Sequence, residues 1–422
     1  MATATTTDPS SATPSPSPAP VPAPAPEVEH PLRNRNFRLL WIGGSISFLG
    51  DQFYMVALPW LILEKTGSAV AMGGVMMAGA IPRALLMLMG GVVSDHFSPR
   101  KIMMSTATSR TICVAVIGLL LWFDMLKVWE LYALAVAFGI ADAFAAPAQS
   151  AYTPFLIKPE QMVKASSIGQ STAQLTTIVG PVPAGFVIKQ LGIAWAFFLD
   201  AISFLFIIGA LWKLPDPPKS QSTRKPPLAA IAEGFTYVVK DVPLSSLMLL
   251  AMVMNFSVSG PVSLGITYLI KTRFNSPTIL GALTSAVAAG TLLGALLAGV
   301  WKIRRRGVMI LLVAAALSPC LAGIGLVSTA FALGGIMFTI GVLAGFMNVH
   351  IGAWIMQRID AAVRGRVASV LMLASVGITP ISFAVAGLLV AWSLKYMFLL
   401  SALAMLLAAA GASVPKSVRE IE

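Results

Sequence analysis

The chain is divided into long apolar runs, each about as long as a bilayer is thick. A transmembrane helix needs about 20 mostly apolar residues. The alternating pattern of a membrane β-barrel is absent from these runs, so helices are the expected spans. The sequence therefore predicts an all-α membrane protein with twelve transmembrane helices, at residues 37–63, 68–93, 102–123, 129–150, 162–187, 193–212, 243–270, 276–301, 307–327, 329–356, 366–391 and 395–412.

Composition and charge agree with a protein whose main solvent is lipid. The chain is 57% hydrophobic and 11% charged, which is far more apolar than a soluble domain requires. Its net charge of +12 is not a nucleic-acid signal, because the basic residues cluster in short loops between apolar runs. We expect the lipid bilayer as a partner, and no nucleic acid.

The distribution of Lys and Arg predicts the orientation. Cytoplasmic loops carry an excess of basic residues. With the N-terminus in the cytoplasm, the cytoplasmic side holds Arg100, Lys101, the basic 213–241 connection and the run at 304–306. The outer side keeps Lys65, Lys127, Lys189, Lys271, Arg273 and Lys395. We expect a multi-pass protein of an inner or plasma membrane, with both termini cytoplasmic.

A Pro-rich connection divides the chain into two halves. We expect a disordered Pro/Ala-rich tail at 1–31, a bundle of six helices at 32–213, and a linker with an amphipathic helix at 214–242. A second bundle of six helices follows at 243–412, and a C-terminal tail at 413–422.

An internal repeat supports two pseudo-symmetric bundles. "VKASSIGQSTAQLTTIVGPVPAGFVI" opens the fifth run and "GRVASVLMLASVGITPISFAVAGLLV" opens the eleventh. Both begin with an Ala-Ser pair, carry a proline midway and end near an Ala-Gly pair. Parallel halves of six spans are typical of one large class of transporters.

Four stretches give the chain a family resemblance. "NRNFRLLWIGGSISFLGDQFYMVALPWLIL", "GGVVSDHFSPRK", "APAQSAYTPFLIKPEQMVKASS" and "RGRVASV" resemble sequences of the major facilitator superfamily. Within it they are similar to the bacterial efflux branch that includes macrolide and enterobactin exporters. The resemblance covers about residues 32–412.

The resemblance implies a gating role for the loop after the second run. Gly91, Asp95, Arg100 and Lys101 match the family's loop signature. In the family this aspartate contacts the opening of the eleventh span, here near residues 365–367. The sequence departs from the signature at its centre, "HFSP". A second interpretation stays open, in which the basic pair only anchors the topology and the aspartate only caps a helix.

A second motif lies in the fifth run. "GPVPAG", with Gly180, Pro181 and Gly185, resembles the helix motif of antiporters in this superfamily. Proline interrupts backbone hydrogen bonds and glycine permits close packing. We expect a bend or a close helix contact here, which would help to close one side of the protein.

Ionisable side chains inside spans are costly and usually functional. Here they are Asp51, Arg83, Arg110, Asp142 and Asp200. Depth along the helices predicts two pairs, Asp51 with Arg83 and Arg110 with Asp142, and places Asp200 in the outer half without a partner. Two interpretations remain open: ion pairs that fix helix register, or an acid that exchanges protons, for which Asp51 is favoured.

The second half has no acid inside its spans. Its polar candidates are Asn255, Asn348, His350 and Gln357. His350 could contact a ligand, relay protons or pack as a hydrogen-bonded core residue. Cys113 and Cys320 lie in apolar runs and form neither a disulfide framework nor a metal site.

These features predict a transporter, not an enzyme. No phosphate-binding loop occurs, so we expect no ATP hydrolysis and no cofactor, with the proton gradient as the energy source. The expected activity is proton-coupled efflux of a lipophilic or amphipathic small molecule by a monomer. The alternatives are a lipid, siderophore or nutrient transporter of the same fold, which could be a uniporter, and a membrane sensor or scaffold.

Overall fold

The computed structural model describes residue 2 and residues 29–217, 227–301, 303–360 and 363–421. Within these ranges, the side chains at 88, 91–92, 94–95 and 227–231 are outside the description. The described residues are almost entirely helical and contain no strand, which confirms the predicted all-α class. Nearly all of the predicted tail at 1–31 lies outside the described residues.

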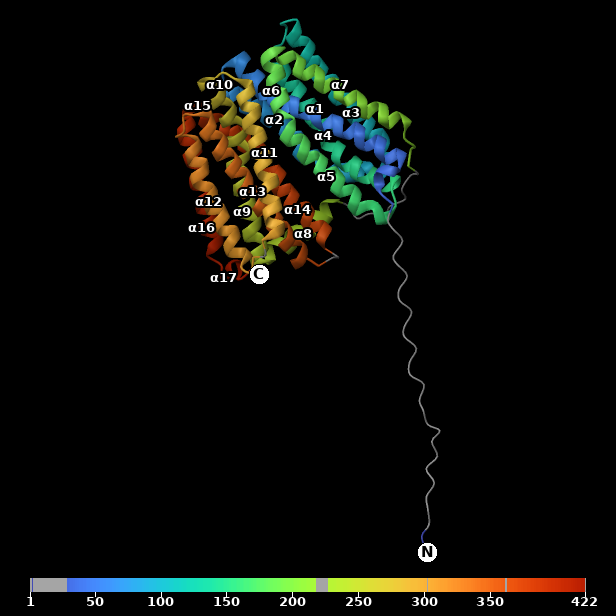
Figure 1. Cartoon of the computed structure of the whole chain (residues 1–422), viewed down its shortest axis with the longest axis vertical. Coiled ribbons are helices and arrows are strands. Elements are labelled where there is room, and N and C mark those ends of the chain that lie inside the picture. The colour runs from blue at the N-terminus through green and yellow to red at the C-terminus, as the bar shows by residue number, and fades with distance from the viewer. Residues whose placement is uncertain (1, 3–28, 218–226, 302, 361–362, 422) are drawn as a thin grey trace.

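The helices form two groups on either side of the linker (Figure 1). The first group comprises η1 (Pro31–Arg33), α1 (Arg35–Thr66), α2 (Ala69–His96), α3 (Pro99–Trp122), α4 (Val128–Leu156), η2 (Pro159–Gln161), α5 (Met162–Val179), α6 (Pro181–Gln190) and α7 (Ile193–Lys213).

The linker helix α8 (Pro227–Lys240) precedes the second group. This group comprises α9 (Val242–Gly260), η3 (Pro261–Gly265), α10 (Ile266–Arg273), α11 (Pro277–Val300), α12 (Arg306–Ile324), α13 (Ala330–Arg358), α14 (Arg364–Gly377), α15 (Thr379–Trp392), α16 (Leu394–Ser413) and α17 (Lys416–Arg419).

Local sequence signals determine where several helices begin and end. The Asn34 side chain accepts hydrogen bonds from the first N–H groups of α1, which are otherwise unpaired. Gly67, with φ of +61°, ends α1 in the left-handed conformation that glycine adopts readily. Ser68 then caps α2 by accepting from the N–H of Ala71. The sharp connection between α1 and α2 therefore follows from two consecutive positions, Gly67 and Ser68.

Eleven helices of the described chain are long and apolar enough to cross a membrane. Our prediction of twelve differs at residues 162–187. The structure breaks this run at Gly180 into α5 and α6, and α5 contains many Ser, Thr and Gln residues. Both helices pack between α1 and α11, so the pair runs through the centre of the molecule, where polar side chains are tolerated.

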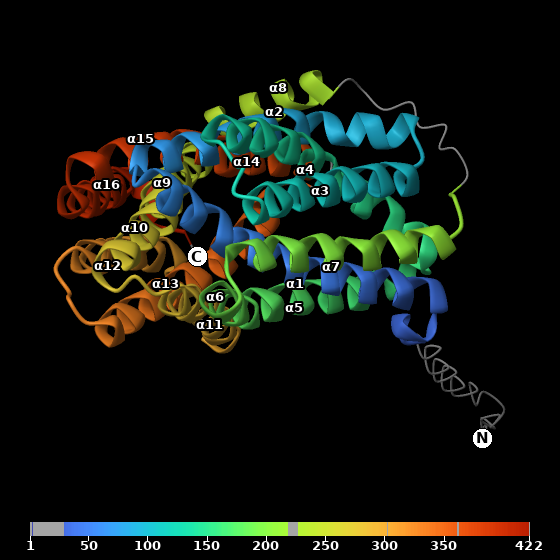
Figure 2. The same ribbon diagram turned by 90° about the horizontal axis from the view of Figure 1, so that it is seen from above.

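The two groups meet at one end of the helices. We call this the far side, where α1 and α6 end and α11 begins; the opposite end, where α1 begins and α8 lies, is the linker side. Viewed as in Figure 2, α6 lies beside α11. Near the start of α2, Gly73 lies so close to α15 that a Cβ there would be 2.7 Å from the Phe383 carbonyl oxygen.

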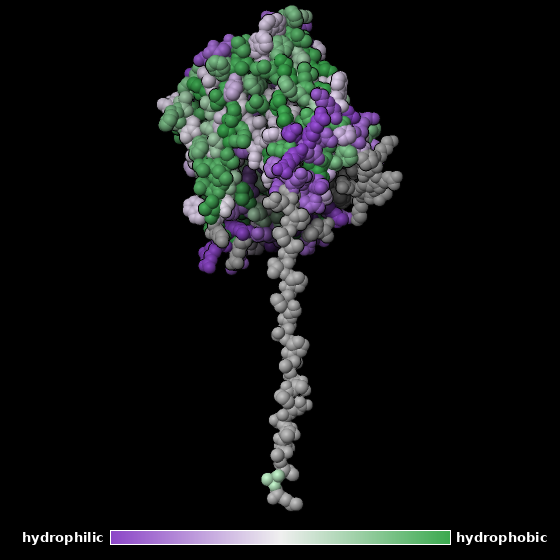
Figure 3. Space-filling model, turned by 45° about the vertical axis from the view of Figure 1, so that its right-hand side comes forward, coloured by the Kyte–Doolittle hydropathy of each residue, from purple (hydrophilic) through white to green (hydrophobic). Residues whose placement is uncertain are grey.

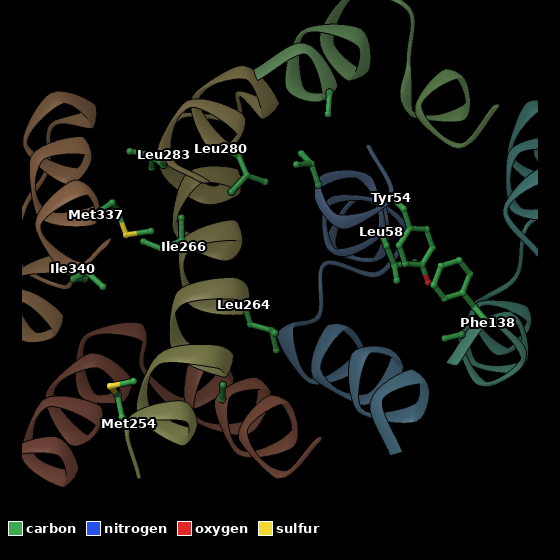
Figure 4. Close-up of a cluster of buried hydrophobic side chains, with 14 of the residues drawn as sticks. Tyr54, Leu58, Phe138, Met254, Leu264, Ile266, Leu280, Leu283, Met337 and Ile340 are labelled. Carbon is green, nitrogen blue, oxygen red and sulfur yellow. The ribbon is translucent and has the colours of Figure 1, made fainter. Parts of the chain in front are cut away.

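Apolar side chains fill each group and also cover its flanks. Figure 4 shows Tyr54, Leu58 and Phe138 in the first group and a separate set around Leu264 and Met337 in the second. The Tyr54 and Phe138 rings stack with centroids 4.4 Å apart. In Figure 3, hydrophobic residues cover much of the visible flank, and hydrophilic ones gather toward its lower end. An apolar outer flank is expected where lipid surrounds the helices.

Candidate transport cavity

A cavity of about 590 Å³ lies between the two groups. Helices α1, α2, α3, α4 and α7 form most of its wall, and Val376, Thr379 and Phe383 close it from the second group. The wall is mainly apolar and rich in flexible methionines, which adapt to irregular ligands. These apolar residues include Phe48, Met55, Met76, Met87, Met103, Phe138 and Phe204.

Four charged side chains form a connected network on this wall. The Arg110 guanidinium pairs with the Asp51 carboxylate and, through Nη1, lies 3.5 Å from Asp142 Oδ1. Arg83 Nε lies 3.0 Å from Asp142 Oδ2. Two acids and two arginines are thus joined in one chain, and their formal charges cancel.

One of the two ion pairs that we predicted from position along the helices is wrong. Arg110 does lie beside Asp142, but Asp51 pairs with Arg110 and not with Arg83. The reason is the direction in which each helix faces. Helix α2 packs extensively against α4 and only slightly against α1, so Arg83 reaches Asp142. Depth along a helix gives no information on that direction.

Two aromatic rings contact the Arg110 guanidinium. The guanidinium lies 4.9 Å from the centroid of Phe138 and 4.4 Å from that of Phe204. Such cation–π contacts strengthen when water is excluded. The Arg110 side chain is 11% exposed, and its Nε is buried without a hydrogen-bond acceptor. Arg110 is therefore the centre of the network and retains one unused donor.

Asp200 lies beside the helix that carries Asp51. Position along α7 predicted the outer half and no partner. In the structure its carboxyl group packs against α1, where a Cβ on Gly50 would lie 2.8 Å from Asp200 Oδ1. Gly50 directly precedes Asp51, and neither carboxyl oxygen of Asp200 has a hydrogen-bond partner among the described residues.

At the loop between α2 and α3, the Arg100 side chain contacts the end of α7 and the start of the linker. Arg100 donates from Nε to the Leu211 carbonyl (2.7 Å) and lies 3.1 Å from Asp216 Oδ2. Ser98 Oγ donates to the other Asp216 oxygen (2.8 Å). Arg100 thus ties the start of α3 to the end of α7 and the start of the linker. We did not predict Asp216 as a partner of Arg100.

The other loop-signature residues are described only in part. The backbone of Gly91 and Asp95 belongs to α2, but the Asp95 side chain lies outside the described residues. The predicted contact of Asp95 with residues 365–367 therefore stays a prediction. Lys101 is exposed.

The motif Gly180-Pro181-Gly185 lies where α6 crosses α11. The helix is interrupted at Gly180, and a Cβ on Gly185 would lie 2.3 Å from the Pro277 carbonyl oxygen. From the other side, a Cβ on Gly281 would lie 2.1 Å from the Pro181 carbonyl oxygen. Both a bend and a close helix contact therefore occur here, at the far side.

An ion pair joins the two groups at the same side. Lys271 Nζ lies 2.8 Å from Glu64 Oε2 and 4.4 Å from the centroid of the Trp60 ring. We did not predict this pair, because its members lie 207 residues apart in the chain. A charge count for each loop cannot reveal such a partner.

The polar candidates of the second group do not form one site. Asn255 and Asn348 border a separate pocket of about 130 Å³ within that group. His350 is buried, with Phe346 against its ring at 4.7 Å and Nε2 without a partner. Gln357 accepts from Arg306 at 2.7 Å. None of the four borders the 590 Å³ cavity.

Comparison with known sequences places the chain in a family. Residues 40–379 match the family model of the Major Facilitator Superfamily. The chain is 26% identical to macrolide efflux protein A of Streptococcus pyogenes over 277 residues, which cover 63% of this chain and 66% of that protein. It is 26% identical to the enterobactin exporter EntS of Escherichia coli over 267 residues, 62% of this chain and 63% of that protein. Each match spans less than two thirds of the relative.

Solved structures show the same fold at low sequence identity. The nucleoside transporter NupG superposes with a TM-score of 0.71 at 14% identity, covering 90% of this chain and 98% of that one. A bacterial homologue of the lysosomal transporter Spinster, in an inward-facing and unoccupied conformation, gives 0.69 at 15% identity, covering 93% and 98%. The chain belongs to the Major Facilitator Superfamily, whose members are transporters and not enzymes.

Proposed function

We propose that this protein exports a lipophilic or amphipathic small molecule in exchange for protons, by alternating access. One observation carries the proposal: a charge network of two acids and two arginines lies on the wall of a largely apolar cavity between the two groups. The apolar surface suits an amphipathic substrate. The buried acids suit proton exchange, because the stability of their charged form depends on whether an arginine accompanies them.

The geometry supports an inward-open state. Close contacts between the groups lie at the far side, between α2 and α15 and between α6 and α11. A second pocket of about 250 Å³ shares Gly44, Phe48 and Gln149 with the main cavity and extends toward the first turns of α1. We assign the linker side to the cytoplasm, on the basis of its basic residues. The substrate would then enter from the cytoplasm or the inner leaflet.

The relatives indicate which compounds to test first. Macrolides and enterobactin are named for the two efflux relatives. Expression in a bacterium that lacks its own exporters should lower the accumulation of the transported compound, and a protonophore should restore it. Asp51→Asn should abolish the effect at equal protein level, with exposed Lys189→Gln as a surface control. Export that continues in the presence of the protonophore would contradict proton coupling.

A further inference from the structure

Asp200 is a buried acid with no partner. It exposes none of its surface, and neither carboxyl oxygen has a hydrogen-bond partner. The Ser203 hydroxyl, one turn along, donates to the Asp200 backbone carbonyl at 2.7 Å. An ionised carboxylate is poorly tolerated in such a place, whereas its neutral, protonated form carries no charge to compensate.

The neighbouring charges do not compensate Asp200. The ionisable groups that face it are Asp51 and Tyr54 on α1 and Arg110 on α3. Helix α6, which also packs on α7, has a single ionisable residue, the exposed Lys189 near its end. Arg110 is already engaged by Asp51 and Asp142, in a network that is neutral without Asp200.

Arg110 is nevertheless close enough to α7 to form an ion pair with Asp200 after a change of rotamer. Its guanidinium lies 4.4 Å from the ring centroid of Phe204, which is one turn beyond Asp200 on α7. Its Nε faces no acceptor. If the Arg110 side chain rotated toward α7, its carboxylate partner would change from Asp51 to Asp200.

We infer that one proton alternates between Asp200 and Asp51, while Arg110 moves in the opposite direction. In the state described here, Asp200 holds the proton and Asp51 pairs with Arg110. When Arg110 moves to Asp200, the Asp200 O–H bond breaks and an O–H bond forms on Asp51, so charge stays balanced. Asp51 borders the cavity and is 17% exposed, so it can pass the proton to cavity water. This inference rests on the proposed proton antiport.

Infrared spectroscopy of the purified full chain can follow this proton without any substrate. A protonated carboxyl group absorbs apart from a carboxylate, and exposed acids are ionised near neutral pH. The wild type should show a protonated carboxyl band that persists to near-neutral pH, and Asp200→Asn should remove it. In Asp51→Asn, Arg110 is free to pair with Asp200, so the band should remain but titrate at lower pH.

Two results would overturn the inference. The first is a wild-type band that survives Asp200→Asn; the second is a band that disappears at every pH in Asp51→Asn, which would place the proton on Asp51 alone. Asn has nearly the shape of a protonated Asp, so Asp200→Asn should fold, and its elution profile and melting temperature check this. If its melting temperature fell as far as that of Arg110→Ala, a neutral Asp200 would be contradicted.

Transport measurements separate this inference from the proposed function. If wild-type flux responds to a pH gradient but the band does not belong to Asp200, only the inference fails. If the band belongs to Asp200 and wild-type flux ignores the pH gradient, antiport fails and Asp200 is a static neutral acid.

Discussion

The two groups of helices share an architecture but differ in where their charges lie. The first group carries Asp51, Arg83, Arg110, Asp142 and Asp200 inside its spans, whereas the sequence places no acid within α9–α16. The second group instead contributes apolar and hydroxyl side chains to the cavity, such as Phe383 and Thr379.

The charge network thus lies in the first group, whereas the second group forms the facing, uncharged part of the cavity wall. A charge network needs fixed neighbours, and the first group supplies these from α1, α2, α3 and α4. The second group packs against the first where helices approach closely at glycines, such as Gly73 and Gly185. We therefore expect substitutions in the first group to affect coupling, and substitutions at the contact between groups to affect conformation.

The largest effect is expected for Arg110→Ala. This change leaves the Asp51 and Asp142 carboxylates without their common partner in a buried place, which costs about 3–5 kcal/mol in comparable buried pairs. We expect a strongly lowered melting temperature and no transport. The melting temperature is measured by heating the protein in detergent and recording the loss of its monodisperse elution peak.

Arg306→Ala is the matched control in the second group. Arg306 donates to Gln357 in an exposed place, so its loss should cost below about 1 kcal/mol. If Arg110→Ala and Arg306→Ala lowered the melting temperature equally, the proposed difference between the two groups would be contradicted.

The next effect is expected where α6 crosses α11. Gly185→Val adds a side chain at a position where even a Cβ lies 2.3 Å from a carbonyl oxygen, so the helices must separate. Overpacking of this kind costs about 1–3 kcal/mol. We expect the far side to open, with greater labelling of a cysteine introduced there. Gly209→Val is the control, since no atom lies within 4 Å of a Cβ at that position. Labelling that is unchanged in Gly185→Val would show that this contact does not hold the far side closed.

A smaller effect is expected for Lys271→Met. The Lys271–Glu64 pair joins the two groups, but its side chains are 21% and 49% exposed. Partly exposed pairs contribute about 0.2–1 kcal/mol and are screened by salt. We expect a small fall in melting temperature at low salt that vanishes at high salt. A loss independent of salt would contradict an electrostatic role.

Lys65→Met is the control for Lys271→Met, because Lys65 pairs with Asp124 inside the first group. The hydrogen bond from the Lys65 ammonium lowers the pKa of Asp124, so the pair stabilises the fold above the ordinary pKa of an aspartate and loses its effect as the pH falls through the lowered value. The melting temperatures of wild type and Lys65→Met should therefore converge on acidification. Labelling of the far side should not change.

The smallest effect is expected for His350→Leu. His350 is buried, its Nε2 has no partner, and it lies outside the main cavity. Replacing an unsatisfied polar group with an apolar one of similar size is close to neutral. Export and melting temperature should stay near wild type. Loss of export at normal stability would place proton or ligand chemistry in the second group.

The sequence predicted the fold well because lipid imposes simple rules. Apolar runs of sufficient length predicted twelve spans. Eleven of them meet the criterion of length and hydropathy in the described structure, and the twelfth, 162–187, is broken into α5 and α6. The same rules identified every member of the charge network, because charges inside spans are rare.

The sequence could not predict how the members meet. Depth paired Arg110 with Asp142 correctly but assigned Arg83 to Asp51, because it carries no information on the direction a helix faces. It named no neighbour for Asp200, because packing between helices decides that α7 brings this acid beside Gly50 of α1. Contacts across the chain, such as Lys271 with Glu64, had no local signal.

The central claim is that the charge network of the first group couples export to protons. The most direct test is uptake of a radiolabelled macrolide, or of enterobactin, into proteoliposomes of the full chain with an imposed pH gradient. We predict accumulation against the substrate gradient that collapses with the pH gradient and is absent in Asp51→Asn. Substrate flux that ignores the pH gradient, in the wild type and in Asp51→Asn alike, would contradict the account.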